Sequence, residues 1–339
     1  MTSYTPEQIA KLKIATKETN RCISLVKELS VPGETSLNVF RKVMESYPKE
    51  FIPAFPLLIS INSELAHCTP TESRNHVFKR GDVVSVDFGL AVDRELLFSD
   101  MARTFIVGDN SSNSSYPFIN QVIQFQKELC LESVKKAGVL TLEGLNNFML
   151  SYIKSKKIPD LKIVRGVSGH EITPGMLHGM RGVSIGPLES KKKDFKLPTG
   201  VFTVEPLLAL SVGSNDMEDG DYIDYETESK SELYLISPMG SKGDPEDEKE
   251  RVFLRKLLSI YGDASFGCYF SFEQLVLKKI MSLDREKLRT LIFSLISKGY
   301  ICESPRIVLP EGNIGFHWEE IFYIPEGENP EPNNLSTPK

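Results

Sequence analysis

The chain has 339 residues, and its 40% hydrophobic and 25% charged residues are typical of a globular protein with a full core. Its net charge of −6 argues against nucleic acid as the main partner, so we expect no specific DNA binding. No stretch of apolar residues is long enough to span a membrane, and the five cysteines are scattered without a CxxC pair. The first residues also lack an apolar signal-peptide segment, so we expect a reduced, cytoplasmic protein with no membrane partner.

Two helices open the predicted fold. Thr5-Pro6-Glu7-Gln8 has the N-cap, proline and capping-box pattern of a helix start, and this helix is expected to run to about Leu29. Ser36 is predicted to cap a second helix that ends near Ser46. Further amphipathic helices are expected over residues 116–137 and 141–156.

Apolar segments rich in β-branched residues predict the strands. Residues 82–92 and 96–107 are the first two, and Asp93-Arg94-Glu95 between them is predicted to form a hairpin turn. The other strand candidates are residues 162–167, 201–211, 231–237 and 314–324.

Residues 245–310 differ from the rest because three helices are predicted there in succession. The first ends near Tyr261, and the others cover residues 270–281 and 284–298. A helical trio followed by a β wing suggests a winged-helix-like insert. We therefore divide the chain into a main domain, residues 1–244 and 311–339, and an insert, residues 245–310. Such folds often bind DNA, but this segment is not especially basic.

Two glycine-led apolar segments each end in a single carboxylate. Residues 81–87 have the sequence GDVVSVD, and residues 200–205 have the sequence GVFTVE. A buried strand that ends in an acid is unfavourable unless the acid has a partner. The similarity of the two segments therefore suggests a duplicated half whose acids, Asp87 and Glu205, converge on one site.

Asp87 and Asp100 are the first candidates for that site. A turn at Asp93-Arg94 places these two aspartates directly opposite each other on adjacent strands. Two carboxylates at this distance repel each other, and a pair of divalent cations removes the conflict. The alternative is that one aspartate is exposed near a strand end, because strand registers slip.

One histidine and two glutamates complete the candidate set. His170 lies in a glycine-rich stretch, where a loop histidine without a ligand is the alternative. Glu205 ends an apolar strand before Pro206, where a structural salt bridge is equally consistent with the sequence. Glu319 stands in an aromatic strand, where a solvent-facing pair with Glu320 is the alternative. Together, an oxygen-rich set with one imidazole suits two ions about 3.5–4 Å apart.

A series of short motifs runs from about residue 5 to residue 325. The series consists of PAFP at 53–56, SINSELAHCTP at 60–70, KRGD and VDFG at 79–89, SDMART at 99–104, SGH at 168–170 with His178 eight residues further on, VFTVEP at 201–206 and WE at 318–319. This series resembles the methionine aminopeptidases of the pita-bread fold, an α+β fold with pseudo-twofold repeated halves. The helical insert before the last motif, entered through Tyr261-Gly262-Asp263-Ala264-Ser265-Phe266, resembles the type 2 kind.

The resemblance implies a role for each matching residue. Asp87, Asp100, His170, Glu205 and Glu319 would bind two divalent ions, with Co, Mn, Zn and Fe as candidates, and Asp100 and Glu319 would bridge them. His67 would contact the substrate near the scissile peptide, and His178 would stabilise the developing oxyanion. Glu205 would also act as general base for the attacking water. Phe55 would help to line an apolar methionine pocket, with core packing as the alternative.

The implied activity is removal of the N-terminal methionine from nascent polypeptides, with the ribosome as a candidate second partner. Two features depart from the family pattern. The two aspartates are thirteen residues apart rather than eleven, and an even-numbered insertion preserves their facing. Glu320 follows the last ligand where the family usually has a histidine, which would make the surroundings of the ligands more negative.

Two other functions fit the same resemblance. A non-catalytic relative, like the proliferation-associated proteins, would act as a ribosome- or nucleic-acid-associated factor. An idle cluster of four acids would destabilise such a protein without metal. An X-Pro dipeptidase also uses two aspartates, one histidine and two glutamates, but the insert and the AHxTP-like run argue against it.

Overall fold

The computed structural model describes residues 4–336 except 93–95, 109–118, 167–168, 180, 184–193, 212–221, 230, 237–242, 262–268 and 328–329. The predicted turn at 93–95 and most of the motif at 261–266 therefore lie outside the described residues. Within the described ranges, no helix is long and apolar enough to cross a membrane. Cys22, Cys68, Cys130 and Cys302 are free thiols.

The helix starts follow from local capping. The predicted capping box is confirmed at the first helix: the Thr5 side chain accepts from the Gln8 backbone N–H, and the Gln8 side chain accepts from that of Thr5. The second helix is capped by Thr35 and not by Ser36, because the Thr35 hydroxyl accepts from the Asn38 N–H. The helices are α1 Pro6–Leu29, α2 Ser36–Met44, α3 Ile119–Ala137, α4 Leu142–Lys156, α5 Glu248–Tyr261, α6 Phe272–Leu277 and α7 Arg285–Ser297.

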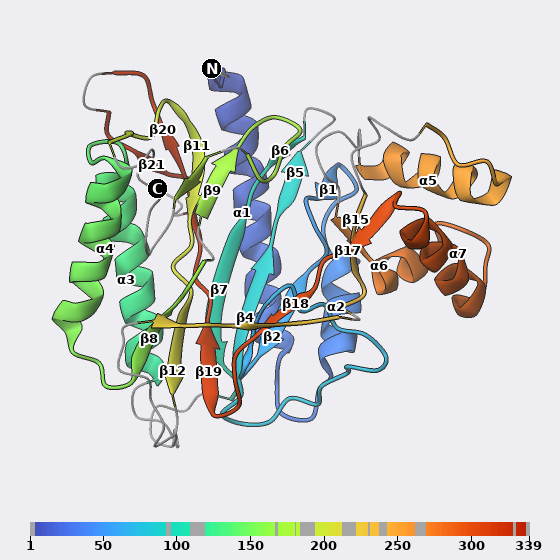
Figure 1. Ribbon diagram of the computed structural model, residues 1–339, viewed down its shortest axis with the longest axis horizontal. Coiled ribbons are helices and arrows are strands. Elements are labelled where there is room, and N and C mark those ends of the chain that lie inside the picture. Colours follow the sequence, from blue (N-terminus) through green and yellow to red (C-terminus); the bar gives the residue numbers. More distant parts are fainter. Residues whose placement is uncertain are drawn as a thin grey trace.

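Three sheets position the candidate residues (Figure 1). The first has the order β2 Leu58–Ile61, β4 Val83–Phe88, β7 Met101–Ile106. The second has the order β10 Gly182–Val183, β9 Gly169–Ile172, β11 Gly200–Val204, β20 Glu320–Ile324, β21 Asn333–Asn334. The third has the order β13 Tyr222–Ile223, β8 Leu161–Val164, β12 Leu208–Ser211, β19 Asn313–Phe316.

Three smaller sheets complete the described strands. Their orders are β1 Phe51–Pro53, β5 Leu90–Val92, β6 Leu97–Phe98; then β14 Glu226–Glu228, β18 Arg306–Val308, β3 Glu64–Ala66; and β16 Tyr269–Ser271, β15 Leu233–Ile236, β17 Ile301–Glu303.

The strands predicted over 201–211 and 314–324 are each divided in two. Pro206 has no N–H to donate, so the ladder is interrupted between β11 and β12 and between their partners β20 and β19. Val204 pairs with Glu320 before the break, and Leu208 pairs with Phe316 after it. Because both pairs share one register, Glu205 lies across from Glu319.

The predicted register of the first hairpin is wrong by two residues. Asp87 lies opposite Ala102 and not opposite Asp100. The strands still form an antiparallel hairpin, with Ala91 opposite Phe98. A shift by two keeps side chains on the same face, so Asp100 remains a diagonal neighbour of Asp87.

The core forms in two helix-backed halves. In one, α1 and α2 pack on the first sheet through residues such as Val26, Phe40 and Val86. In the other, α3 and α4 pack on the second and third sheets through residues such as Leu129 and Met149. Figure 1 shows α3 and α4 side by side along one flank of the strands. The candidate residues lie at the interface between these two halves.

Helices α5 to α7 and the sheet β16-β15-β17 form a lobe with a core of its own, at the right of Figure 1. This core includes Tyr234 and Ile236, which precede residue 245. The segment predicted as a helix over 270–281 begins with β16, and α6 covers only Phe272–Leu277. Division of the chain into two domains stays a prediction.

Candidate metal centre

Five residues from distant parts of the chain meet at one point. Their places are Asp87 on β4, Asp100 just before β7, His170 on β9, Glu205 just after β11 and Glu319 just before β20. One ligand atom each from Asp87, Asp100 and Glu319 lies within 4.8 Å of the others. The same holds for His170, Glu205 and Glu319. Glu319 belongs to both groups, so the structure brings the whole predicted ligand set together.

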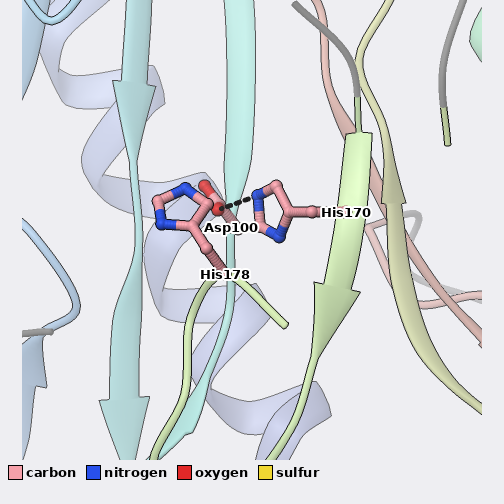
Figure 2. Close-up of side chains that lie close together, drawn as sticks. All are labelled: Asp100, His170 and His178. Carbon is pink, nitrogen blue, oxygen red and sulfur yellow. Dashed lines mark ion pairs between the residues drawn. The ribbon is translucent and has the colours of Figure 1, made fainter. Parts of the chain in front are cut away.

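The imidazole of His170 faces the carboxylates. Its Nε2 atom lies 3.3 Å from Oδ2 of Asp100 and 3.9 Å from Oε1 of Glu319. Figure 2 shows Asp100 between the rings of His170 and His178. Those two rings have centroids 4.4 Å apart, and atoms of Asp100, His170 and His178 also fall within 4.8 Å of one another.

Backbone contacts fix the segments that carry these side chains. The His170 N–H donates to the Thr203 hydroxyl at 3.0 Å. A Cβ at Gly169 would lie 2.2 Å from the Thr203 carbonyl oxygen, so only glycine permits this approach of β9 to β11. The Glu319 N–H donates to the Ala102 carbonyl at 3.0 Å, which ties the last ligand segment to β7.

Ionised acids at this centre are energetically unfavourable without a cation. Burial, together with neighbouring carboxylates, holds the pKa of Asp87, Asp100 and Glu319 well above the ordinary range. Oδ1 of Asp87 and Oε1 of Glu319 are buried and accept no hydrogen bond among the described residues. Buried carboxylate oxygens without donors are unfavourable, and a divalent cation satisfies both their charge and their lone pairs. The donor set therefore fits metal ions.

A cavity of about 250 Å³ opens above the acids. His67 and His178 lie on its wall, and its apolar lining consists of Phe55, Leu58, Ala66, Leu177, Leu233 and Tyr269. Phe55 is also 6% exposed and belongs to the core, so it packs and lines the cavity at once. The cavity thus combines a carboxylate floor with an apolar wall.

Both wall histidines have a lowered pKa, which favours the neutral imidazole. Desolvation lowers the pKa of His67, and desolvation with nearby His170 and His67 lowers the pKa of His178 well below the usual range. Nδ1 of His67 lies 3.2 Å from the Ser304 hydroxyl. A neutral imidazole keeps one N–H to donate, which suits the predicted roles of His67 and His178.

His317 is a member of the site that sequence reasoning did not assign. It is 1% exposed, and its Nε2 lies 2.7 Å from Oε1 of Glu205. The available signal was the spacing, since His317 stands two residues before Glu319 and strand alternation would put both on one face.

Glu320 does not add uncompensated negative charge to the ligands, which corrects the expectation from the sequence. Alternation turns it to the other face of the strand, where Oε1 lies 3.1 Å from Nη2 of Arg103 and accepts from the Trp318 indole at 2.7 Å. Oε2 accepts from the Asn334 amide at 3.2 Å. Arg103 also stacks on Trp318, with its guanidinium carbon 4.6 Å from the ring centroid.

Comparison with known proteins gives the family. Residues 5–231, more than half of the chain, match metallopeptidase family M24. The chain belongs to metallopeptidase family M24. This M24 protein is therefore related to peptidases that use divalent metals, which agrees with the donor set at its centre.

Several of its sequence relatives are methionine aminopeptidases. That of Archaeoglobus fulgidus is 30% identical over 214 residues, which cover 60% of this chain and 65% of the relative. Methionine aminopeptidase 2 of Sordaria macrospora is 25% identical over 279 residues, which cover 80% of this chain and 56% of the relative. The M24 protein thus spans less than two thirds of the length of these relatives.

Solved structures confirm the pita-bread fold. A thermophilic Arx1 superposes with a TM-score of 0.76 at 12% identity, covering 99% of this chain and 92% of that one. Methionine aminopeptidase of Thermotoga maritima superposes with a TM-score of 0.61 at 18% identity, covering 100% of both chains. Prolidase of Pyrococcus furiosus reaches 0.54 at 16% identity, covering 99% of this chain and 66% of that one. At these identities the likeness concerns the fold alone.

Proposed function

We propose that this M24 protein is a type 2 methionine aminopeptidase that removes the N-terminal methionine from nascent polypeptides. The observation that supports this best is the intact set of five donors on the floor of a cavity with an apolar wall. Its methionine aminopeptidase relatives, at 30% and 25% identity, favour this activity within the family. The helical lobe and the coverage of 80% by a methionine aminopeptidase 2 favour type 2.

The two ions would be Co, Mn, Zn or Fe. Asp87, Asp100 and Glu319 would hold one, and His170, Glu205 and Glu319 would hold the other, so Glu319 belongs to both groups. When bound, such a pair polarises a scissile carbonyl and lowers the pKa of water.

The chain's own side chains would do the rest. Phe55, Leu58 and Leu177 would take up the apolar methionine side chain, and the small cavity would exclude water around it. An Oε atom of Glu205 would accept the proton of the attacking water. His178 would donate a hydrogen bond from its ring N–H to the developing oxyanion, and His67 would contact the scissile peptide.

Two other functions remain as outcomes of the same test. A catalytically impaired homologue would keep the fold and act in the cytoplasm as a ribosome- or nucleic-acid-associated factor. An X-Pro dipeptidase would use the same donors on a different substrate. A contact of the aminopeptidase itself with ribosomes, to reach nascent chains, is part of the proposal.

The test uses the metal-depleted full chain with added Mn or Co. We expect release of methionine from Met-Ala-Ser and no cleavage of an X-Pro dipeptide. His170→Ala should reduce the rate by about a hundred-fold or more, because it removes the one imidazole among the five donors. His76→Ala should retain the wild-type rate, because His76 does not line the cavity. Cleavage of the X-Pro dipeptide alone would favour the dipeptidase. No turnover with any metal, together with co-sedimentation with ribosomes, would favour the non-catalytic factor.

A further inference from the structure

Glu205 lies where the hydrogen-bonded ladder of the sheet is interrupted. It follows β11 directly and precedes Pro206, where the ladder to the neighbouring strand is interrupted. The hydrogen bonds of β11 therefore end one residue before it. Within the described residues, the side-chain contact recorded for the Glu205 carboxylate is with His317, at 2.7 Å between Oε1 and Nε2. The orientation of this carboxylate thus depends on a partner outside its own strand.

His317 itself is held firmly. Its N–H donates to the Thr104 hydroxyl at 3.0 Å, and its carbonyl accepts from the same hydroxyl at 2.8 Å. Thr104 is in turn 2.8 Å from the hydroxyl of Ser85 on β4. The preceding carbonyl, of Phe316, accepts from the buried Gln126 amide at 2.9 Å. These contacts anchor the backbone at His317 to β4, β7 and α3, and so fix the point from which its side chain projects.

The burial of the His317 ring also needs an explanation. It is 1% exposed, and burying an imidazole is unfavourable unless its nitrogens have partners. Its Nε2 lies 2.7 Å from Oε1 of Glu205 and has no hydrogen-bond partner among the described residues. The pair therefore resembles a metal-binding carboxylate that is held in place by a neighbouring side chain.

We propose that His317 is a positioning residue that orients the Glu205 carboxylate toward the ion shared with His170 and Glu319. This inference rests on the proposed metal-dependent function, and it assigns a role to a residue of this chain for which the motifs gave none. His317 contacts Oε1 of Glu205, so Oε2 is the oxygen left for the ion and for the attacking water. It acts through Glu205 and touches neither ion nor substrate.

The experiment measures metal binding directly. The metal-depleted full chain and its His317→Ala and His317→Gln variants are titrated with Mn by calorimetry, and the Co-loaded proteins are compared by visible absorption. Alanine should weaken one of two binding steps by about 10- to 100-fold and change the Co spectrum, while the other step stays as in wild type. Glutamine, which keeps a side-chain N–H at a similar reach, should recover most of the affinity and of the spectrum.

His76→Ala is the matched control. It removes another histidine–carboxylate contact, 2.6 Å between His76 Nε2 and Asp82 Oδ2, that lies outside the cavity. This variant should bind both ions as wild type does. Circular dichroism of all three variants checks that they are folded.

The outcomes separate this inference from the proposed function. Wild-type affinity and spectrum in a folded His317→Ala would overturn the positioning role, as would equal losses in the alanine and glutamine variants. Binding of no metal by the wild-type chain would overturn it as well. If the wild type binds two ions but releases no methionine from Met-Ala-Ser, the proposed activity fails while the metal titration still decides the role of His317.

Discussion

Three carboxyl groups dominate the chemistry of single residues in this protein. Asp87, Asp100 and Glu319 lie close together, and Asp100 and Glu319 are almost fully buried at 3% and 2% exposure. Each has a pKa raised by burial and by its neighbours. The metal-free folded protein must therefore either keep these carboxyl groups protonated or bury their negative charge. The unfolded chain instead exposes the same groups to water.

The sign of the resulting pH dependence follows from linkage. In the unfolded chain these carboxyl groups ionise near a pKa of about 4, whereas the folded protein still binds their protons above that pH. We expect the metal-free protein to lose stability as pH rises from about 4 through the raised pKa values. Calorimetric melting in EDTA over a pH series measures this, and saturating Mn should reverse the loss at neutral pH.

Asp87→Asn tests the same chemistry by substitution. It removes one of the repelling charges, so the metal-free variant should be more stable than wild type at neutral pH. It also removes a donor, so Mn should raise its melting temperature less than that of wild type. An Asn variant with an undiminished Mn-induced rise would contradict a ligand role for Asp87.

At the scale of elements, strand alternation sorts two adjacent acids into different environments. Glu319 faces the cavity, and Glu320 faces Arg103 and Trp318 on the reverse side. The side chain of Arg103 is 16% exposed and that of Glu320 is 3% exposed. Removal of one charge would therefore leave the other poorly compensated.

Glu320→Gln should consequently destabilise the fold by about 1–3 kcal/mol in chemical denaturation. Metal affinity by calorimetry should stay within about two-fold of wild type, because Glu320 lies on the opposite face from the donors. Glu132→Gln is the control, since it breaks the exposed pair with Lys135 and should change stability by less than about 0.5 kcal/mol. A large gain in metal affinity in Glu320→Gln would show that its charge does reach the ligands.

The element boundaries show where local patterns suffice. Thr5 and Gln8 cap α1 through contacts within one turn, so the sequence alone reveals them. Pro206 likewise explains the end of β11 from its own chemistry. The matching break at Trp318 has no such local signal, because it is imposed by the partner strand across the ladder.

At the scale of the whole molecule, the cavity is closed by residues from the helical lobe. Leu233 on β15 and Tyr269 on β16 belong to the lobe's own sheet, yet both line the cavity. The Tyr269 ring stands edge-on to His178, with centroids 5.6 Å apart at 80°. The lobe is attached by ion pairs, including Arg41 with Glu273 at 3.1 Å.

Tyr269→Ala should therefore weaken substrate handling without disturbing the metals. Loss of the ring removes apolar contact worth about 1.5 kcal/mol or more, so kcat/KM for Met-Ala-Ser should fall about ten-fold or more. Tyr269→Phe keeps the ring and should remain near wild type, and Mn affinity should be unchanged in both. A phenylalanine variant as impaired as the alanine one would point to the hydroxyl instead of the ring.

The sequence by itself determined the donor types, the start of α1 and the family resemblance, because each depends on residue chemistry over a few neighbours. Asp87, Asp100, His170, Glu205 and Glu319 could all be named from their motifs. Their metal-binding and catalytic roles stay predictions until they are measured.

Only the tertiary structure decided how these residues meet. The hairpin register places Asp87 opposite Ala102, the ladder places Glu205 across from Glu319, and His317 reaches Glu205 over 2.7 Å. Some of these pairings join positions more than a hundred residues apart. The free energy that stabilises them comes from the packing of whole sheets and helices. No local pattern encodes that sum, so register and side-chain partnership appear only when the chain is folded.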